Sequence, residues 1–568
     1  MKIKSIQNAL LVFIATIPLM GLCQNPLFIP DTLTGPSIDL SFQTGEVEFY
    51  EGFTTHTFGY NQAILGPTLI LKKGEDIILN VTNDLTEPTT LHWHGLHVSA
   101  ENDGGPHTVI EAGETWSPAF KVLDNAATYW YHPHLHERTE WHVTKGGAGF
   151  IIVRDEEEAL LDLPRSYGID DFPVAIQSRA FDADKQVVQQ TAADDVMLIN
   201  GTLDAFLDVP AQVVRLRLLN GSTERVYNFG FEGNIEFYQI ATDGGLLDAP
   251  VTLTRLMLSP GERAEILLNM TGREDDSFNM MSFASEMPNG IYGATSPGGG
   301  QMSSIPGYDA NDLNGSDFNI MRLNVVAQNE NPVTDIPASL ITNTPYSESD
   351  VMTTRSLLFR AKVMGPQNAL TGPFVINGVS FDLEVINYEI PLDNIEVWQL
   401  TNMTAISHPF HIHDVQFYIL DINGVAPPAN MRGRKDVVLV PPMGSTVRFI
   451  TKFDDHTSEV PYMYHCHMLS HEDDGMMGQF VVFDNASATN DQSGVEVTVY
   501  PNPTTDQVTL SGLMPSTIEL YNMSGQLLDR RISKTGVEKF SLMNYQPGVY
   551  YFEVITLKER QTLSVVKN

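Results

Sequence analysis

The chain has 568 residues, of which 42% are hydrophobic and 18% charged, and this is the composition of a globular protein long enough for about four domains. Its formal net charge is −37. So acidic a balance argues against nucleic acid or anionic lipid as a partner. It fits either a surface that attracts cations or a surface that is acidic only for solubility.

The first residues are typical of an export signal. Lysines precede an apolar run at residues 9–20, and that run is too short to span a bilayer comfortably. We predict a signal peptide over residues 1–23, cleaved after Cys23. A lipid anchor on Cys23 is the alternative, although Leu22 before it fits an anchor poorly. No later stretch is apolar enough for a membrane helix, so we expect no membrane span.

Short β-rich runs between Gly, Pro, Asn and Asp clusters recur along the chain, without a long amphipathic helix. Three of these runs end in asparagine, at residues 76–83, 213–220 and 394–402. Each is followed by a Gly-containing turn and another strand. The pattern predicts an all-β protein with three copies of one sandwich or Greek-key barrel domain.

Loop-like composition places the expected domain boundaries. A loop rich in Gly, Ser, Pro and Asn at residues 282–316 reads as an excursion of the second copy. The predicted parts after the signal peptide are residues 24–160, 161–335 and 336–485, a polar linker at 486–495, and a small unit at 496–568.

The sixteen histidines are distributed very unevenly. Nine lie between His56 and His142, seven lie between His408 and His471, and residues 143–407 contain none. Structural histidines would be scattered more evenly along the chain. We therefore predict one shared site, formed where the first and third copies face each other.

Four His-x-His pairs have the spacing of metal ligands. Residues two apart on a strand share a face, so each pair sends two imidazoles in one direction. Eight neutral imidazoles suit a transition metal such as copper or zinc rather than a hard cation. The pairs are His92 and His94, His132 and His134, His411 and His413, and His465 and His467.

After cleavage Cys466 is the one remaining cysteine, so disulfides do not stabilise the chain. Because it lies between His465 and His467, its sulfur must point to the opposite face of the strand. There it would meet His408 and His471. Two imidazoles, a thiolate and a weak thioether make a blue-copper site.

Met476 or Met477 can supply that thioether. The thiolate and the two flanking imidazoles then belong to neighbouring sites, and electrons can pass between the sites through bonds over about 12 Å. The histidines without a place in this pattern are predicted to be surface or supporting residues. They are His56, His97, His107, His142 and His456, together with His136, which is ambiguous because it continues the alternation of His132 and His134.

At these residues the chain resembles the multicopper oxidases, specifically the three-domain bacterial laccase, bilirubin oxidase and copper-efflux oxidase group. The resemblance covers roughly residues 40–485. It implies three cupredoxin-like Greek-key β-barrel domains with a copper cluster between the first and the third. The motifs are His92-Trp93-His94-Gly95, His132-Pro133-His134, His408-Pro409-Phe410-His411-Ile412-His413, and His465-Cys466-His467 followed by His471 and Met476.

The resemblance also implies four copper ions and assigns their ligands. His471 would lie toward solvent as the entry point for electrons. The implied ligands are His408, Cys466, His471 and Met476 for type 1; His92 and His411 for type 2; His94, His132 and His467 for one type 3 ion; and His134, His413 and His465 for the other.

Two carboxylates match the proton-delivery positions of this family. Asp103 corresponds to the acid near the type 2 copper, and Glu472 to the acid near the type 3 pair. Reduction of dioxygen to water consumes protons, so nearby acids are expected. Either residue could instead be an ordinary turn or ligand-supporting residue.

The C-terminal unit resembles another family, the β-sandwich sorting domain of type IX secretion. The resemblance rests on residues 499–503, 518–526, 547–551 and 564–568. It implies type IX secretion machinery as a partner and a location outside the cell or on its outer surface. The alternative is an ordinary accessory β-domain.

The function that we expect is laccase-like oxidation of phenolic or similar small donors, coupled to the reduction of dioxygen to water. We expect the chain to act as a monomer. A metallo-oxidase of Cu(I), Fe(II) or Mn(II) is the alternative. The copper-efflux members carry a Met-rich insert and acid and Met residues before His408, whereas this chain lacks the insert and has Thr404 and Ile406 there. A non-catalytic copper-binding envelope protein is the third interpretation.

Overall fold

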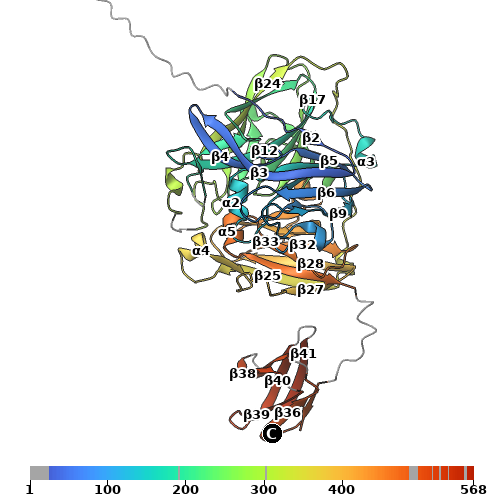
Figure 1. Ribbon diagram of the computed structural model, residues 1–568, viewed down its shortest axis with the longest axis vertical. Coiled ribbons are helices and arrows are strands. Elements are labelled where there is room, and N and C mark those ends of the chain that lie inside the picture. Colours follow the sequence, from blue (N-terminus) through green and yellow to red (C-terminus); the bar gives the residue numbers. More distant parts are fainter. Residues whose placement is uncertain are drawn as a thin grey trace, which may run out of the picture. The chain divides into compact units, whose positions relative to one another are not determined.

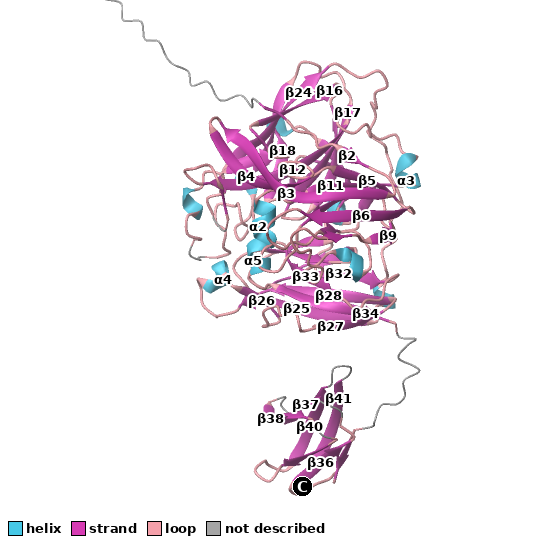
Figure 2. Ribbon diagram, viewed as in Figure 1, coloured by secondary structure: helices cyan, strands magenta, loops and turns pink. Residues whose placement is uncertain are grey.

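The structure is a computed structural model that describes residues 25–189, 192–300, 304–484, 497–513, 516–522, 526–534, 536–555 and 560–568. The predicted signal peptide and the predicted linker lie outside these residues. Internal contacts divide the chain into two units, residues 1–483 and 484–568. Strands dominate both units, and the helices are short (Figure 1, Figure 2). No helix in the described ranges is both long and apolar enough to cross a bilayer.

The first repeat consists of two sheets around one buried core. Their strand orders are β2(Thr32–Leu33)-β5(Thr68–Lys72)-β11(Gly149–Arg154)-β10(Ala127–His132)-β7(His92–His94), and β4(Phe53–Tyr60)-β3(Ser37–Tyr50)-β6(Asp76–Asn83)-β8(Thr115–Trp116) with β9(Ala119–Lys121) also on β6.

The second repeat has the same two-sheet construction around its own core. Its sheets are β15(Thr202–Leu203)-β14(Val196–Ile199)-β12(Asp171–Phe181)-β17(Val213–Asn220)-β22(Arg263–Asn269)-β19(Phe237–Thr242)-β20(Gly245–Leu253), with β13(Val187–Val188) on β12, and β1(Asn25–Pro26)-β16(Ala205–Pro210)-β24(Asp317–Val326)-β23(Ser277–Phe283)-β18(Tyr227–Phe231)-β21(Leu256–Leu258).

The third repeat contributes the sheets β26(Phe374–Ile376)-β25(Thr353–Ala361)-β28(Asn394–Asn402)-β32(Ser445–Phe453)-β30(Phe417–Ile422) and β27(Tyr388–Pro391)-β34(Met477–Phe483)-β33(Tyr462–Cys466)-β29(His408–Ile412)-β31(Val437–Val440). The helices of these repeats are α1(Ala100–Asp103), α2(Thr139–Thr144), α3(Glu156–Ala159), α4(Asn368–Thr371) and α5(Leu469–Asp473). Helices α2 and α5 lie side by side (Figure 1), because the backbone N–H groups of Thr139 and Glu140 donate to the Asp473 carboxylate.

The second unit is a small sandwich with its own apolar core. Its sheets are β35(Thr498–Tyr500)-β36(Gln507–Ser511)-β39(Val537–Ser541) and β38(Leu527–Ser533)-β37(Ser516–Asn522)-β40(Gly548–Ile555)-β41(Arg560–Lys567). The expected fold class, three cupredoxin-like barrels and a small C-terminal β-sandwich, is confirmed.

The three runs that end in asparagine are equivalent strands, β6, β17 and β28. Each pairs in parallel with one strand of its repeat and antiparallel with another. In each, the buried asparagine amide donates to two backbone carbonyls and its oxygen accepts a backbone N–H two residues later. Asparagine is required because its side chain supplies donors and an acceptor where the strand turns away. These residues are Asn83, Asn220 and Asn402.

The first described strand packs with the second repeat, although its residues fall in the range predicted for the first domain. Strand β1, in the range expected for the first domain, pairs in parallel with β16 of the second repeat. Leu27 is buried in the core of the second repeat. The start of the chain therefore ties the first two repeats together, and the boundaries near residues 160 and 335 stay predictions.

A buried ion network holds the first repeat against the second. Arg217 on β17 donates to Asp171 over 2.6 and 2.9 Å and to Glu265 over 2.6 Å. Arg215 pairs with Glu265, and Arg154 on β11 of the first repeat donates to Asp171 over 2.8 Å. Removal of one charge from such a network leaves the buried opposite charges incompletely paired. The free-energy cost of that loss is much larger than the net stabilisation that the ion pair provides.

We expect Arg217→Ala to lower the free energy of unfolding by about 3–5 kcal/mol, because the buried carboxylates of Asp171 and Glu265 would each lose one charged partner and keep only the pairs with Arg154 and Arg215. Thermal and denaturant unfolding of the full chain measure this. Arg273→Ala is the control, since Arg273 forms a partly exposed pair with Asp276 worth about 0–1 kcal/mol. Equal effects of the two substitutions would contradict the interpretation.

Candidate metal centre

Two pairs of antiparallel strands carry the histidine motifs. In the first repeat β7 pairs with β10, so that His92 lies opposite His132. In the third repeat β29 pairs with β33, so that His411 lies opposite His465. Strand registry thus brings together pairs that are far apart in sequence. The second member of the last three pairs lies just beyond its strand, at positions 134, 413 and 467.

Three imidazoles from both repeats converge in a first triad. His94 Nδ1 lies 3.4 Å from His132 Nε2 and 3.3 Å from His467 Nε2. The second triad is equally tight, with His465 Nε2 at 3.2 Å from His134 Nε2 and 3.4 Å from His413 Nε2. The nitrogens of each triad lie within 4.8 Å of one another. Such triangles of buried nitrogens suit metal ions.

Beside the two triads, His92 and His411 form a third group, a pair of imidazoles. Each Nδ1 faces a backbone carbonyl, that of Asp103 at 3.0 Å and that of Asp436 at 2.8 Å. Each Nε2 is buried and has no hydrogen-bond partner. Buried polar atoms are rarely left without a partner. Two imidazole nitrogens without partners beside the triads fit one more metal ion.

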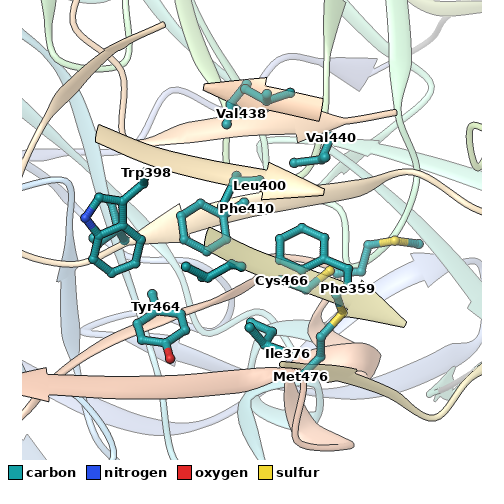
Figure 3. Packing of buried hydrophobic residues seen from close by; sticks show 14 of the residues in the cluster. Phe359, Ile376, Trp398, Leu400, Phe410, Val438, Val440, Tyr464, Cys466 and Met476 are labelled. Atoms are coloured by element: carbon teal, nitrogen blue, oxygen red, sulfur yellow. The ribbon is translucent and has the colours of Figure 1, made fainter. Parts of the chain in front are cut away.

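The Cys466 thiol lies on the other face of β33, as its position between two histidines predicts. Its Sγ is 3.4 Å from His408 Nδ1 and 3.6 Å from His471 Nδ1. Met476 is buried in the same cluster as Cys466 (Figure 3). Met477 instead lines a separate cavity beside Tyr464. Of the two methionines that the sequence leaves open, Met476 is therefore the one in the Cys466 cluster.

Burial favours the neutral form of eight of these imidazoles by lowering the pKa of each. Desolvation lowers the pKa of His134 to about 4 and that of His471 to about 3. Desolvation likewise lowers the pKa of His94, His132, His408, His411, His413 and His467 well below the usual histidine value. The same desolvation raises the pKa of the Cys466 thiol. Neutral imidazoles are ready ligands, whereas a metal that binds Cys466 must displace its proton.

The two predicted carboxylates contact the outer nitrogens of the histidines. Asp103 lies 2.8 Å from His413 Nδ1 and 3.3 Å from His92 Nδ1. Glu472 lies 3.1 Å from His465 Nδ1 and 3.4 Å from His134 Nδ1. Both side chains are almost fully buried. Each carboxylate therefore orients two imidazoles and directs their other nitrogens into the site.

Three neighbours of the histidines were not found from the sequence. Asp436 Oδ1 lies 3.2 Å from His94 Nε2, and no spacing rule links the two residues. Thr404 Oγ1 lies 2.9 Å from His408 Nε2, at a position noted only for lacking the copper-efflux pattern. Trp130 stacks on His132 with ring centroids 4.2 Å apart. Their i, i+2 spacing on β10 could have predicted that stacking.

The histidines outside the motifs lie in other surroundings. His97 faces Asp414 at 2.8 Å, and His142 is buried with Nε2 at 3.3 Å from Glu87. His107 contacts Gln479 at 2.8 Å, and the ambiguous His136 packs against Phe381 at 5.1 Å. The remaining positions are His56 beside Glu46 and His456 beside His97.

A cavity of about 370 Å³ adjoins the Cys466 site and is lined by His471. Apolar residues form part of its wall, among them Tyr292 and Leu370. The carboxylates of Glu224 and Asp474 also line it. The cavity is large enough for a small aromatic molecule or a hydrated cation.

Comparisons with known proteins agree with this geometry. Families described as multicopper oxidase match residues 41–158, 173–295 and 345–486, and the family described as secretion system C-terminal sorting domain matches residues 498–568. The chain is 33% identical over 455 residues to multicopper oxidase mco of Staphylococcus aureus, covering 78% of this chain and 88% of that protein.

Two further relatives cover most of the first unit. The chain is 32% identical over 469 residues to the cell division protein FtsP of Photorhabdus laumondii, covering 81% of this chain and 92% of that protein. The laccase-like multi-copper oxidase CueO of Ochrobactrum sp. superposes with a TM-score of 0.71 at 34% identity, covering 81% of this chain and 100% of that one. The chain therefore belongs to the multicopper oxidase family, and it ends in a secretion system C-terminal sorting domain.

Proposed function

We propose that the chain is a laccase-like oxidase that couples one-electron oxidation of phenolic or similar small donors to reduction of dioxygen to water. The observation that carries the proposal is the placement of Cys466. Its sulfur lies with His408 and His471, while His465 and His467 on either side of it enter separate triads. This arrangement links a donor-side site to a cluster through three consecutive residues.

We assign four copper ions to these nitrogens and sulfurs. Cysteine and imidazole donors in this mixture suit copper, and the unpartnered Nε2 atoms of His92 and His411 fit one ion of the cluster. The assigned ligands are His408, Cys466, His471 and Met476 for type 1; His92 and His411 for type 2; and His94, His132, His467 and His134, His413, His465 for the two type 3 ions.

Bound copper supplies the one-electron redox chemistry. The chain supplies the path and the surroundings. His471 lines the donor cavity and contacts Cys466, and the backbone and side chains of residues 465–467 connect that sulfur to both triads. The triads are buried away from bulk water, whereas His471 is partly exposed and lines the cavity, so a donor in that cavity lies on the His471 side.

We assign to Asp103 and Glu472 the relay of the protons that water formation consumes. Each carboxylate contacts two imidazoles from outside and lies within the buried site. A carboxyl group in this position can pass a proton inward and keep the imidazoles oriented. Asp103 lies beside His92 and His413, so it serves the type 2 side and one triad together.

A metal ion is the second candidate donor. Glu224 and Asp474 line the same cavity as His471, and carboxylate oxygens bind divalent cations. Fe(II) or Mn(II) fits these oxygen donors better than Cu(I), which prefers sulfur. A non-catalytic copper-binding role is disfavoured by the complete set of ligand positions in both sites.

The sorting domain indicates type IX secretion to the cell surface or beyond. We propose that the predicted signal peptide starts this export and that the enzyme acts there as a monomer. The dioxygen and reductant that the family uses are then available from the surroundings of the cell. We also propose that the boundaries between the three repeats lie near residues 160 and 335.

The test of function is oxygen uptake by copper-loaded protein against a dimethoxyphenol, bilirubin, Cu(I), Fe(II) and Mn(II). We expect the phenol to give the highest rate and the protein to be blue. Cys466→Ser should abolish the colour and the uptake, because the sulfur is the link to the cluster. Oxygen consumption by Cys466→Ser at the wild-type rate would contradict the proposal. So would a wild-type protein that binds copper and turns over none of these donors.

The thioether of Met476 provides a second expected outcome. As an axial ligand it should lower the type 1 potential, so Met476→Leu should raise the potential and keep the blue colour. Redox titration of the blue band measures this. Met477→Leu is the matched control, since Met477 lines a different cavity and should leave the potential unchanged. A lower potential in Met476→Leu would refute the assignment.

Loss of the Asp103 carboxylate should slow dioxygen reduction and spare donor oxidation. We expect Asp103→Asn to lower turnover by about 10- to 100-fold, while anaerobic bleaching of the blue band by a phenol stays at the wild-type rate. Glu101→Gln, on the same helix α1 but exposed, is the control. If Asp103→Asn slowed the anaerobic bleaching as much as the turnover, Asp103 would maintain the structure of the whole site and would have no specific role in dioxygen reduction.

A further inference from the structure

The second repeat contains no histidine, yet one of its turns reaches the first triad. We name as the positioning turn the segment from Ser259 to Arg263, which comprises the turn between β21 and β22 and the first residue of β22. Its members are buried almost completely. It contacts the triad at two points, through the Arg263 side chain and through the backbone of Gly261.

Arg263 acts through Asp436 of the third repeat. Its Nη1 and Nη2 each donate to the Asp436 carboxylate over 2.6 Å. Asp436 Oδ1 in turn lies 3.2 Å from His94 Nε2, which comes from the first repeat. All three side chains have no solvent exposure. The contact therefore joins all three repeats in one line of charge-assisted hydrogen bonds.

The Arg263 guanidinium is itself held rigidly. Its remaining N–H groups donate to the backbone carbonyls of Thr128, Gly261 and Asp243 over 3.0–3.1 Å. A guanidinium fixed in this way presents two parallel donors to a carboxylate, which a lysine cannot do. This pairing fixes the orientation of the Asp436 carboxylate, whose Oδ1 faces both Arg263 Nη1 and His94 Nε2.

This contact determines which nitrogen His94 presents. With Nε2 directed at Asp436, the ring presents Nδ1 to His132 and His467. The other two members of the triad present Nε2. Rotation of His94 away from Asp436 would remove Nδ1 from the triangle. The orientation of this ring thus depends on an acceptor that the second repeat holds in place.

Two glycines leave the space for these contacts. A Cβ on Gly95, directly after His94, would lie 2.4 Å from Asp436 Oδ2 and 2.7 Å from Arg263 Nη2. A Cβ on Gly261 would lie 3.0 Å from atoms of the His467 ring. Both glycines also have φ near +80 to +90°. The backbone of the positioning turn therefore packs directly on one triad member while its arginine supports another.

We propose that the positioning turn of the second repeat, acting through Arg263 and Asp436 and through contact with His467, sets the metal geometry of the His94, His132 and His467 triad. The inference rests on the proposed copper function. It makes Arg263 and Asp436 positioning residues, and it gives the histidine-free repeat a specific part in the metal centre.

The test compares Asp436→Asn and Arg263→Lys with wild type as purified, copper-loaded full chains. Asp436→Asn keeps the side-chain shape and removes the charge that Arg263 holds, whereas Arg263→Lys keeps the charge and removes the paired donors. We expect copper affinity at the cluster to fall roughly 10- to 100-fold in chelator titration. An additional EPR signal from uncoupled copper should appear, because one member of the coupled pair is lost.

Two readouts separate positioning from general destabilisation. The blue band should stay at wild-type intensity, because the Cys466 site has its own ligands. Arg217→Lys is the matched control, since Arg217 is an equally buried arginine on the adjacent strand β17 and pairs bidentately with Asp171. This control should retain all its copper.

Full copper retention by both Asp436→Asn and Arg263→Lys would overturn the inference, and so would equal copper loss in Arg217→Lys. If either variant fails to fold, the other still decides, and Gly95→Ala tests the same contact by inserting a methyl group between Asp436 and Arg263. A wild-type protein that binds no copper would end the proposed function as well, so the two failures are distinguishable.

Discussion

The alternation of side chains along β33 is the constraint on which the rest of the site depends. A strand sends neighbouring residues to opposite faces, so Cys466 must separate from the histidines on either side of it. One face can then hold a site open to a donor, while the other enters a closed pocket. Any shift of register by one residue would exchange the two faces and destroy both sites together.

The closed pocket exists only because two repeats supply half of it each. Every triad mixes imidazoles from the first and third repeats, so no single domain can form it alone. The rings present nitrogens to one another without solvent, an arrangement that gains nothing unless a metal ion satisfies those lone pairs. We infer that copper binding contributes to holding the repeats together, in addition to its role in the reaction.

Spacing in the sequence predicted the parts of the site that follow from local geometry. The shared face of His92 and His94 and the opposite face of Cys466 are consequences of strand periodicity. Local spacing left Met476 and Met477 open, and the resemblance alone named Met476, which the structure packs in the Cys466 cluster. The orientation of His94 needed Asp436, which is 342 residues away. Contacts of that range depend on how domains pack, and no periodicity in the chain encodes them.

The same distinction explains the fold. The asparagines that end β6, β17 and β28 are visible in the sequence because each makes local hydrogen bonds, so three repeats could be predicted. The pairing of β1 with β16 had no local signal. The buried charges between repeats are expensive to desolvate and would be replaced by apolar contacts if stability alone mattered. Arg263 joins three domains at one imidazole. We infer that such charged pairs are retained because they fix the relative positions of the domains. Apolar surfaces could slide past one another by about an ångström, and a triangle of metal ligands would not tolerate that displacement.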